Sequence, residues 1–145
     1  MPIAAFASLL LAAGSPALGD ARALDALVDQ LYSSYRAGNA PRPQWATSTQ
    51  QLVQLWQQRH PDADAPPVTE ILCACRDWDA PDFHVETLTR VFTGPGRAVM
   101  LLRVWPNKRR SGDVRLSLVK EGSRWAVEEI GDPSSGRSLT ALLRR

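Results

Sequence analysis

The chain is poor in the residues that most often bind metals or act as nucleophiles, with two cysteines and two histidines among 145 residues. Its charge is nearly balanced, because seventeen basic and fifteen acidic side chains leave a formal net charge of +2. So small an excess does not favour binding to nucleic acid. Nine glycines and eleven prolines are too few for a collagen-like or low-complexity chain, and 44% of the residues are hydrophobic. The length therefore predicts one folded domain.

The sequence also lacks the common catalytic and cofactor-binding motifs. It has no glycine-rich phosphate loop, no dinucleotide fingerprint and no Ser-His-Asp or Cys-His signature. A closed zinc site needs four ligands, and beside the two cysteines only His60 and His84 could contribute. We therefore expect neither a metal nor a cofactor, and the sequence alone identifies no substrate.

The first nineteen residues, Met1 to Gly19, contain no charged side chain, and Ile3–Ala13 is a mostly apolar run. This run is as long as the hydrophobic region of a secretory signal and too short to span a membrane. Small residues suited to signal-peptidase cleavage follow at Ala17-Leu18-Gly19 and again at Ala21-Arg22-Ala23. The pattern predicts a signal peptide over 1–19, extending at most to 23, and a periplasmic or secreted protein with no transmembrane segment in the mature chain. Because no Lys or Arg opens the segment, a buried core element remains the alternative interpretation.

Helical periodicity follows the leader. Apolar residues at steps of three and four predict a helix over about Asp20 to Arg36, with the stripe Leu24, Leu27, Val28, Leu31, Tyr32 and Tyr35. A second helix is predicted over Thr49–Arg59, capped by Thr47 or Ser48 and buried through Leu52, Val53, Leu55 and Trp56. The proline-rich stretch Pro61–Pro67 predicts a loop.

The period changes to two from Val85 onward. Val85, Thr87, Thr89 and Val91 are predicted to share one face of a strand. Arg97–Trp105 is apolar on both faces apart from two arginines, as in a central strand with one side under helices. Two more strands and a short terminal helix follow, through Val114, Leu116 and Leu118, then Trp125, Val127 and Glu129, and finally Leu139, Leu142 and Leu143. The order predicts an α+β fold with N-terminal helices packed on a curved antiparallel sheet of about four strands.

Several of these residues together resemble a family of small exported bacterial proteins of unknown function. They are the paired tyrosines of the first helix, the Asp77-Trp78 pair before the sheet, the Gly-x-x-Trp-x-Val strand (Gly122, Trp125, Val127) and the closing Ser138-Leu139 helix. The resemblance covers about Ala23 to Leu143. Two features depart from it: Arg76 stands where a Gln commonly precedes the Asp-Trp pair, and Cys73-Ala74-Cys75 is not typical of the family.

That family is similar in fold to the nuclear-transport-factor-like superfamily, so the resemblance implies a single cone-like domain over 20–145 with a pocket between sheet and helices. Members of the superfamily include ketosteroid isomerase, dehydratases and many proteins without chemistry, so the fold does not choose a function. In such a cone the pocket residues would be Tyr32, Tyr35, Trp78, Trp125 and Glu129.

The two cysteines are separated by one residue. If Glu70 to Cys75 is extended, Cys73 and Cys75 point to the same face with their Cα atoms about 6.5 Å apart, near the limit for a disulfide, so a bridge would be strained. The possibilities are a redox-active pair, a soft-metal site, two buried apolar residues, or an incidental structural bridge.

The candidates for acid–base chemistry are Asp77, Asp79, His84, Glu86 and Glu129. Glu129 stands out because it is predicted to share a face with Trp125 and Val127, where burial would raise the pKa of its carboxyl and suit a general acid or base. Each of these residues also has a simpler structural interpretation. Glu129 could pair with an arginine, Asp77 could form a turn or cap a helix, and His84 could lie solvated at an edge of the sheet.

Aromatic and basic residues could also mark a recognition surface. Trp45 and Trp105 stand beside prolines and could lie at a rim, although packing is the simpler role. The cluster Lys108-Arg109-Arg110 and the terminal Arg144-Arg145 could meet an acidic partner or be solvated.

Three functions remain open from the sequence. The first is a non-enzymatic envelope protein that binds a small molecule or an envelope protein, favoured because no connected catalytic constellation is visible. The second is a cofactor-free isomerase, dehydratase or hydrolase that uses Glu129, with His84 or Asp77 assisting. The third is an inhibitor or immunity-type protein that docks on another enzyme through Pro61–Pro67 and Lys108–Arg110.

Overall fold

The computed structural model describes residues 18–145. Most of the predicted signal peptide, residues 1–17, lies outside the described residues. The described elements are α1 (Leu18–Arg36), α2 (Thr47–Arg59), α3 (Val68–Cys73), a 3-10 turn η1 (Ala80–Asp82), β1 (His84–Gly94), β2 (Arg97–Trp105), β3 (Gly112–Glu121), β4 (Arg124–Gly131) and α4 (Leu139–Leu143). The predicted α+β class is confirmed.

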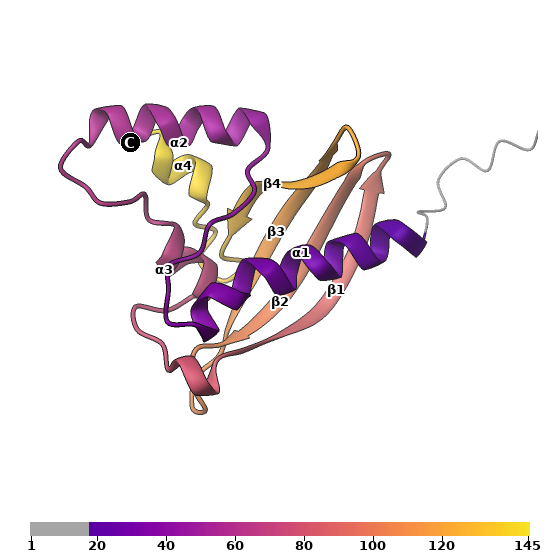
Figure 1. Cartoon of the computed structure of the whole chain (residues 1–145), viewed down its shortest axis with the longest axis horizontal. Coiled ribbons are helices and arrows are strands. Elements are labelled where there is room, and N and C mark those ends of the chain that lie inside the picture. Colours follow the sequence, from indigo (N-terminus) through magenta and orange to yellow (C-terminus); the bar gives the residue numbers. More distant parts are fainter. Residues whose placement is uncertain (1–17) are drawn as a thin grey trace, which may run out of the picture.

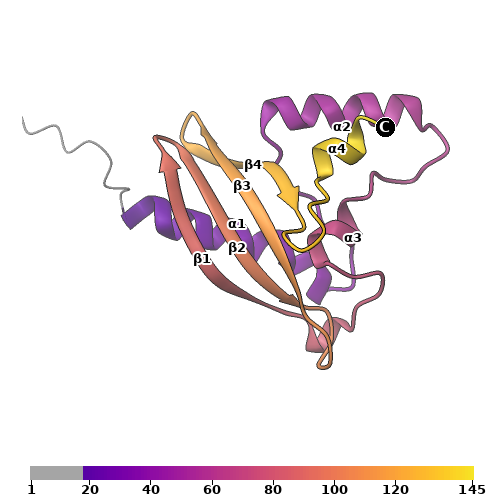
Figure 2. The same ribbon diagram turned by 180° about the vertical axis from the view of Figure 1, so that it is seen from behind.

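The four strands form one antiparallel sheet in the order β1-β2-β3-β4, which stays open and does not close into a barrel. Helix α1 crosses one face of this curved sheet, whereas α2 and α4 lie beyond the β4 edge (Figure 1). Seen from behind, the opposite face carries no helix from the described part of the chain (Figure 2).

The core lies between α1 and the covered face of the sheet. Alternate residues of β2 are buried there, as the sequence predicted for a central strand under helices: Ala98, Met100, Leu102 and Val104. The predicted stripe of α1 meets them through Leu24, Val28, Leu31, Tyr32 and Tyr35. Burial of these side chains is the main favourable contribution to folding.

A β-bulge changes the faces predicted for the edge strand β1. In β1, Thr87 pairs with Leu102 and Thr89 with Leu101, so Leu88 is an extra residue between them. Thr89 and Val91 therefore lie on the uncovered face, and Val85 and Thr87 on the covered one. The prediction that all four share a face is wrong, because an inserted residue inverts the alternation after it.

Helix α2 begins two residues earlier than predicted, and neither Thr47 nor Ser48 is its cap. The N-cap is Ala46, which has no side-chain acceptor. The carboxylate of Glu121 takes this role instead, accepting from the Thr47 backbone N–H at 2.9 Å. The predicted burial of Leu55 is also wrong, since half of its surface is exposed.

Besides the short 3-10 turn η1, the sequence did not predict helix α3. Its six residues directly follow the expected proline-rich loop. Among the residues that the structure describes, no helix is both long enough and apolar enough to cross a membrane.

Candidate functional site

A groove of about 1000 Å3 lies beside α3, at the end of the sheet where β2 turns into β3. We call it the α3 groove. It is lined by Pro67, Glu70, Ile71, Ala74, Cys75, Arg76 and Asp77, by Pro106, Asn107, Arg110 and Ser111, and by Asp132, Arg137 and Leu142. The groove thus joins three segments that are far apart in sequence.

The side chains of this groove are rich in charge. Arg76, Arg110 and Arg137 are exposed, and none has an ion-pair partner within 4 Å among residues 18–145. Asp132 is already engaged, because its carboxylate accepts hydrogen bonds from Ser134 and Ser135. These hydrogen bonds lower the pKa of Asp132 to about 2. The arginines are therefore open to an incoming anionic group.

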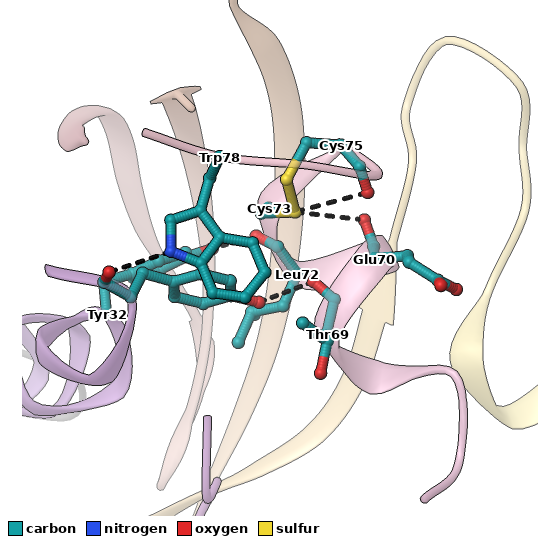
Figure 3. The surroundings of a disulfide bond; sticks show 8 residues. Tyr32, Thr69, Glu70, Leu72, Cys73, Cys75 and Trp78 are labelled. Atoms are coloured by element: carbon teal, nitrogen blue, oxygen red, sulfur yellow. Dashed lines mark hydrogen bonds between the residues drawn. A yellow bond between two sulfur atoms is a disulfide. The ribbon is translucent and has the colours of Figure 1, made fainter. Parts of the chain in front are cut away.

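The two cysteines form a disulfide at the wall of the groove (Figure 3). Their Cα atoms are 5.1 Å apart, within the usual range for a disulfide, because the segment is not extended. Cys73 is instead the last residue of α3, and Ala74 turns the chain back in the left-handed conformation with φ 51°. Ala74 is the only non-glycine residue with positive φ among residues 18–145.

A close approach to β3 holds this turn in place. A Cβ atom added at Gly112 would lie 2.6 Å from the Cβ of Ala74, closer than two carbon atoms can pack. Glycine at 112 is therefore required by the nearness of the disulfide turn. The sequence alone does not indicate this contact, because Gly112 and Ala74 are far apart along the chain.

The two sulfur atoms differ in their surroundings. Cys73 is 1% exposed, and its Sγ lies 3.6 Å from the carbonyl oxygen of Glu70 and 3.4 Å from that of Cys75. Cys75 is only half-buried and faces the groove. Because the bridge closes a loop of just three residues, it removes little entropy from the unfolded chain, about 1.6 kcal/mol in the chain-entropy relation.

Two buried tyrosines fix α3 to α1. The Tyr32 hydroxyl donates to the carbonyl oxygen of Leu72 at 2.8 Å, and the Tyr35 hydroxyl donates to that of Thr69 at 2.6 Å. The Trp78 indole N–H donates to the Tyr35 carbonyl at 2.9 Å. Burial raises the pKa of both tyrosines. Figure 3 shows Tyr32, Leu72 and Trp78 beside the disulfide.

The same residues, which the resemblance implied would line a ligand pocket, pack against one another and against Phe83. The rings of Tyr35 and Phe83 stack at 4.7 Å, and Trp78 meets Tyr35 edge-on at 5.1 Å. Tyr32 packs against Phe83 at 6.0 Å. The structure therefore brings Tyr32, Tyr35 and Trp78 together, as a packed aromatic cluster.

The other predicted pocket residues lie elsewhere. Trp125 packs on Phe92, and its indole N–H donates to Asp20 at 3.2 Å. Trp125 and Arg42 contribute to a separate hollow of about 380 Å3. A third hollow, of about 560 Å3, lies between α1 and β1.

Glu129 does not share a face with Trp125 and Val127. Leu118 pairs with Val127 but Ser117 pairs with Glu129, so Glu128 is an extra residue that moves Glu129 to the other face. The Glu129 carboxylate accepts from the backbone N–H and the hydroxyl of Thr140, in the first turn of α4. Glu129 therefore caps the N-terminus of α4 and joins β4 to α4.

The remaining acid–base candidates are not brought together. His84 is exposed on β1 and stacks on Trp105 at 5.5 Å, at the edge of the sheet opposite to Glu129. Three strand spacings of about 4.8 Å separate these edges. Asp77 is exposed in the wall of the α3 groove, and Asp79 donates its backbone N–H to Pro106. Glu86 lies opposite Arg103, which is itself paired with Asp113.

Sequence reasoning missed most of the α3 groove. It singled out Pro67, Cys75, Asp77 and Arg110, but it assigned no role to Arg76 or Arg137. No group of three or more His, Cys, Asp or Glu that could hold a metal ion occurs between residues 18 and 145. Comparison of the chain with protein-family models, curated proteins and solved structures finds no match.

Proposed function

We propose that the protein is an exported, non-enzymatic binding domain that holds a segment of a partner polypeptide in the α3 groove. One observation carries this proposal. Tyr32 and Tyr35, which the resemblance implied would line an internal pocket, are buried and stack on Phe83. A ligand therefore binds at the surface, and the α3 groove is the largest of the three hollows described above.

The character of the groove supports a polypeptide over a small molecule. Sites for small molecules are mostly apolar and enclose their ligand. The α3 groove is lined instead by exposed side chains of both signs, including Arg76, Arg137 and Asp77. Arginine is enriched at protein interfaces, where it makes bidentate hydrogen bonds to carboxylates. An acidic stretch of the partner would satisfy these arginines.

Export remains part of the proposal and is supported by the apolar segment Ile3–Ala13 with its small residues downstream. The nuclear-transport-factor-like relationship is likewise proposed. The order of N-terminal helices, a four-stranded meander and a closing helix supports it.

Native mass spectrometry of the protein purified from its host envelope tests the proposal. We expect a protein partner to be retained by the wild-type chain and lost from the double variant Arg76→Glu/Arg137→Glu. Arg42→Glu serves as the matched control, because Arg42 is exposed but lies outside the groove. Retention of the partner by the groove variant, or retention of a small molecule in its place, would contradict the proposal.

A further inference from the structure

We propose that the Cys73–Cys75 disulfide is a thiol–disulfide exchange site, and that its substrate is a thiolate entering the α3 groove. This inference does not depend on the identity of the bound polypeptide. It rests on the unequal burial of the two sulfur atoms, the basic groove beside them and the independent anchoring of α3.

Access decides which sulfur reacts. Exchange begins with attack of a thiolate on one sulfur of the disulfide. Cys75 lines the groove and is half-buried, whereas Cys73 is 1% exposed. The attack therefore falls on Cys75 Sγ.

Charge favours the approach of the attacking group. A thiolate is an anion, and Arg76, Arg110 and Arg137 line the groove without ion-pair partners among residues 18–145. Arg76 directly follows Cys75 in the chain. The opposing carboxylates are Glu70, Asp77 and Asp132, of which Asp132 is held by its own serines. Guanidinium groups near a thiol stabilise its thiolate form.

The step balances without a further oxidant. The incoming sulfur bonds to Cys75 Sγ, the bond between the two cysteines breaks, and its electron pair goes to Cys73 Sγ. Cys73 then takes a proton from water and becomes a thiol. Its S–H can donate to the carbonyl oxygens of Glu70 and Cys75, which already lie 3.6 and 3.4 Å from the sulfur. A second thiolate attacks the outer sulfur of the mixed disulfide, releases Cys75 as a thiol and leaves as the oxidised dimer.

Contacts other than the bridge also hold α3 to α1. Tyr32 and Tyr35 hold α3 through the carbonyl oxygens of Leu72 and Thr69. Both of these residues precede the cysteines in the chain. Opening the bridge frees only the turn at Ala74, whose left-handed conformation is unfavourable for a residue with a Cβ atom. Exchange is therefore a local event at the wall of the groove.

The attacking thiolate can belong to a small molecule or to a cysteine of a polypeptide. To distinguish these sources, the purified mature chain is incubated with glutathione in one arm and with a short cysteine-containing peptide in the other. The reaction is quenched with acid, free thiols are alkylated and the products are mapped by mass spectrometry. We expect the mixed disulfide on Cys75 and the alkyl group on Cys73, with unchanged circular dichroism, and the faster arm identifies the source. Exchange seen only in urea that unfolds the chain, or a mixed disulfide on Cys73, would overturn the proposal.

Two single variants provide a matched pair. Cys73→Ala and Cys75→Ala both remove the bridge, but the first leaves the groove-facing thiol and the second leaves the buried one. Because reactivity follows exposure and thiolate character, we expect the free thiol of Cys73→Ala to react about tenfold faster or more with an aromatic disulfide reagent. Equal rates in folded protein would contradict the assignment of Cys75 as the attacked sulfur.

Discussion

The hydroxyl of Tyr32 donates a 2.8 Å hydrogen bond to the carbonyl oxygen of Leu72, the residue next to Cys73. This contact joins α1 to the unpredicted helix α3 across forty positions of sequence. It holds α3, and with it one wall of the α3 groove, against α1.

Removing this hydroxyl should destabilise the fold. Leu72 lies in the last turn of α3, where carbonyls lack partners within the helix, so Tyr32→Phe leaves a buried acceptor unpaired. We expect a loss of about 1–3 kcal/mol in the free energy of unfolding, measured by urea denaturation. Tyr35→Phe should cost less, about 1 kcal/mol, because Thr69 lies in the first turn of α3 and its carbonyl also has an intrahelical donor. An unchanged stability in Tyr32→Phe would contradict this role.

Stability should fall in alkali through the same two residues. The chain has two tyrosines, and burial raises the pKa of both above the ordinary value of 10.0. Above about pH 10 the unfolded chain loses these protons and the folded chain keeps them, so the free energy of unfolding falls as the pH rises, by about 1.4 kcal/mol per pH unit for each tyrosine. Titration of tyrosinate absorbance should show no ionisation until the protein unfolds. A smooth titration near pH 10 in folded protein would show that the rings are accessible.

Gly112 offers a test of the packing at the disulfide turn. Gly112→Ala places a Cβ atom against that of Ala74 and should cost about 1–3 kcal/mol. Gly94→Ala is the control, since nothing lies within 4 Å of its added Cβ. Adding Ala74→Gly to Gly112→Ala should restore stability, because the double variant removes the facing Cβ and suits the positive φ. Failure of the second change to rescue the first would show that the two residues are not in contact.

Substitution of Glu129 tests whether its carboxylate caps α4. Its carboxylate accepts from Thr140 at the start of α4, so Glu129→Ala should lower the free energy of unfolding by about 1–2 kcal/mol. The neighbouring change Glu128→Ala removes only an exposed pair with Arg97 and should have little effect. If the two changes lowered the free energy of unfolding equally in urea denaturation, the capping role of Glu129 would be contradicted.

The mature N-terminus should be Asp20. Its carboxylate accepts hydrogen bonds from Lys120 at 2.9 Å and from Trp125, which lower the pKa of Asp20. Cleavage after Ala23 would remove these contacts and the Ala21 carbonyl that accepts from Arg90. We therefore expect cleavage after Gly19, measured by N-terminal sequencing of protein made in its own host. An intact Met1 would contradict export, and a chain starting at Leu24 would contradict the choice of cleavage site.

The sequence predicted the fold better than the site. Helix α1 and the four strands follow from apolar periodicity that a single packed face imposes, as in Leu24, Val28 and Leu31. The bulges at Leu88 and Glu128 broke that alternation, and no local signal marks an inserted residue. The faces of Thr89 and Glu129 were therefore assigned wrongly.

Helix α3 and its groove were not predicted, for a different physical reason. Six residues are too few to show helical periodicity, and α3 is held by hydroxyl groups from α1. Arg76, Arg110 and Arg137 line one groove because three separate segments of the chain converge there. The spacing of residues along the sequence does not reveal this. The roles of Ala74 and Gly112 depend on a contact between two chain segments.

Site-specific photo-crosslinking in the host envelope tests most directly whether the α3 groove is the binding surface. A photoreactive residue at Ser111 would lie in the groove, and one at Thr93 would be exposed at the opposite end of the β1–β2 hairpin. The account predicts a discrete protein adduct from Ser111 and none from Thr93. An adduct from Thr93 alone, or none from either position, would contradict it.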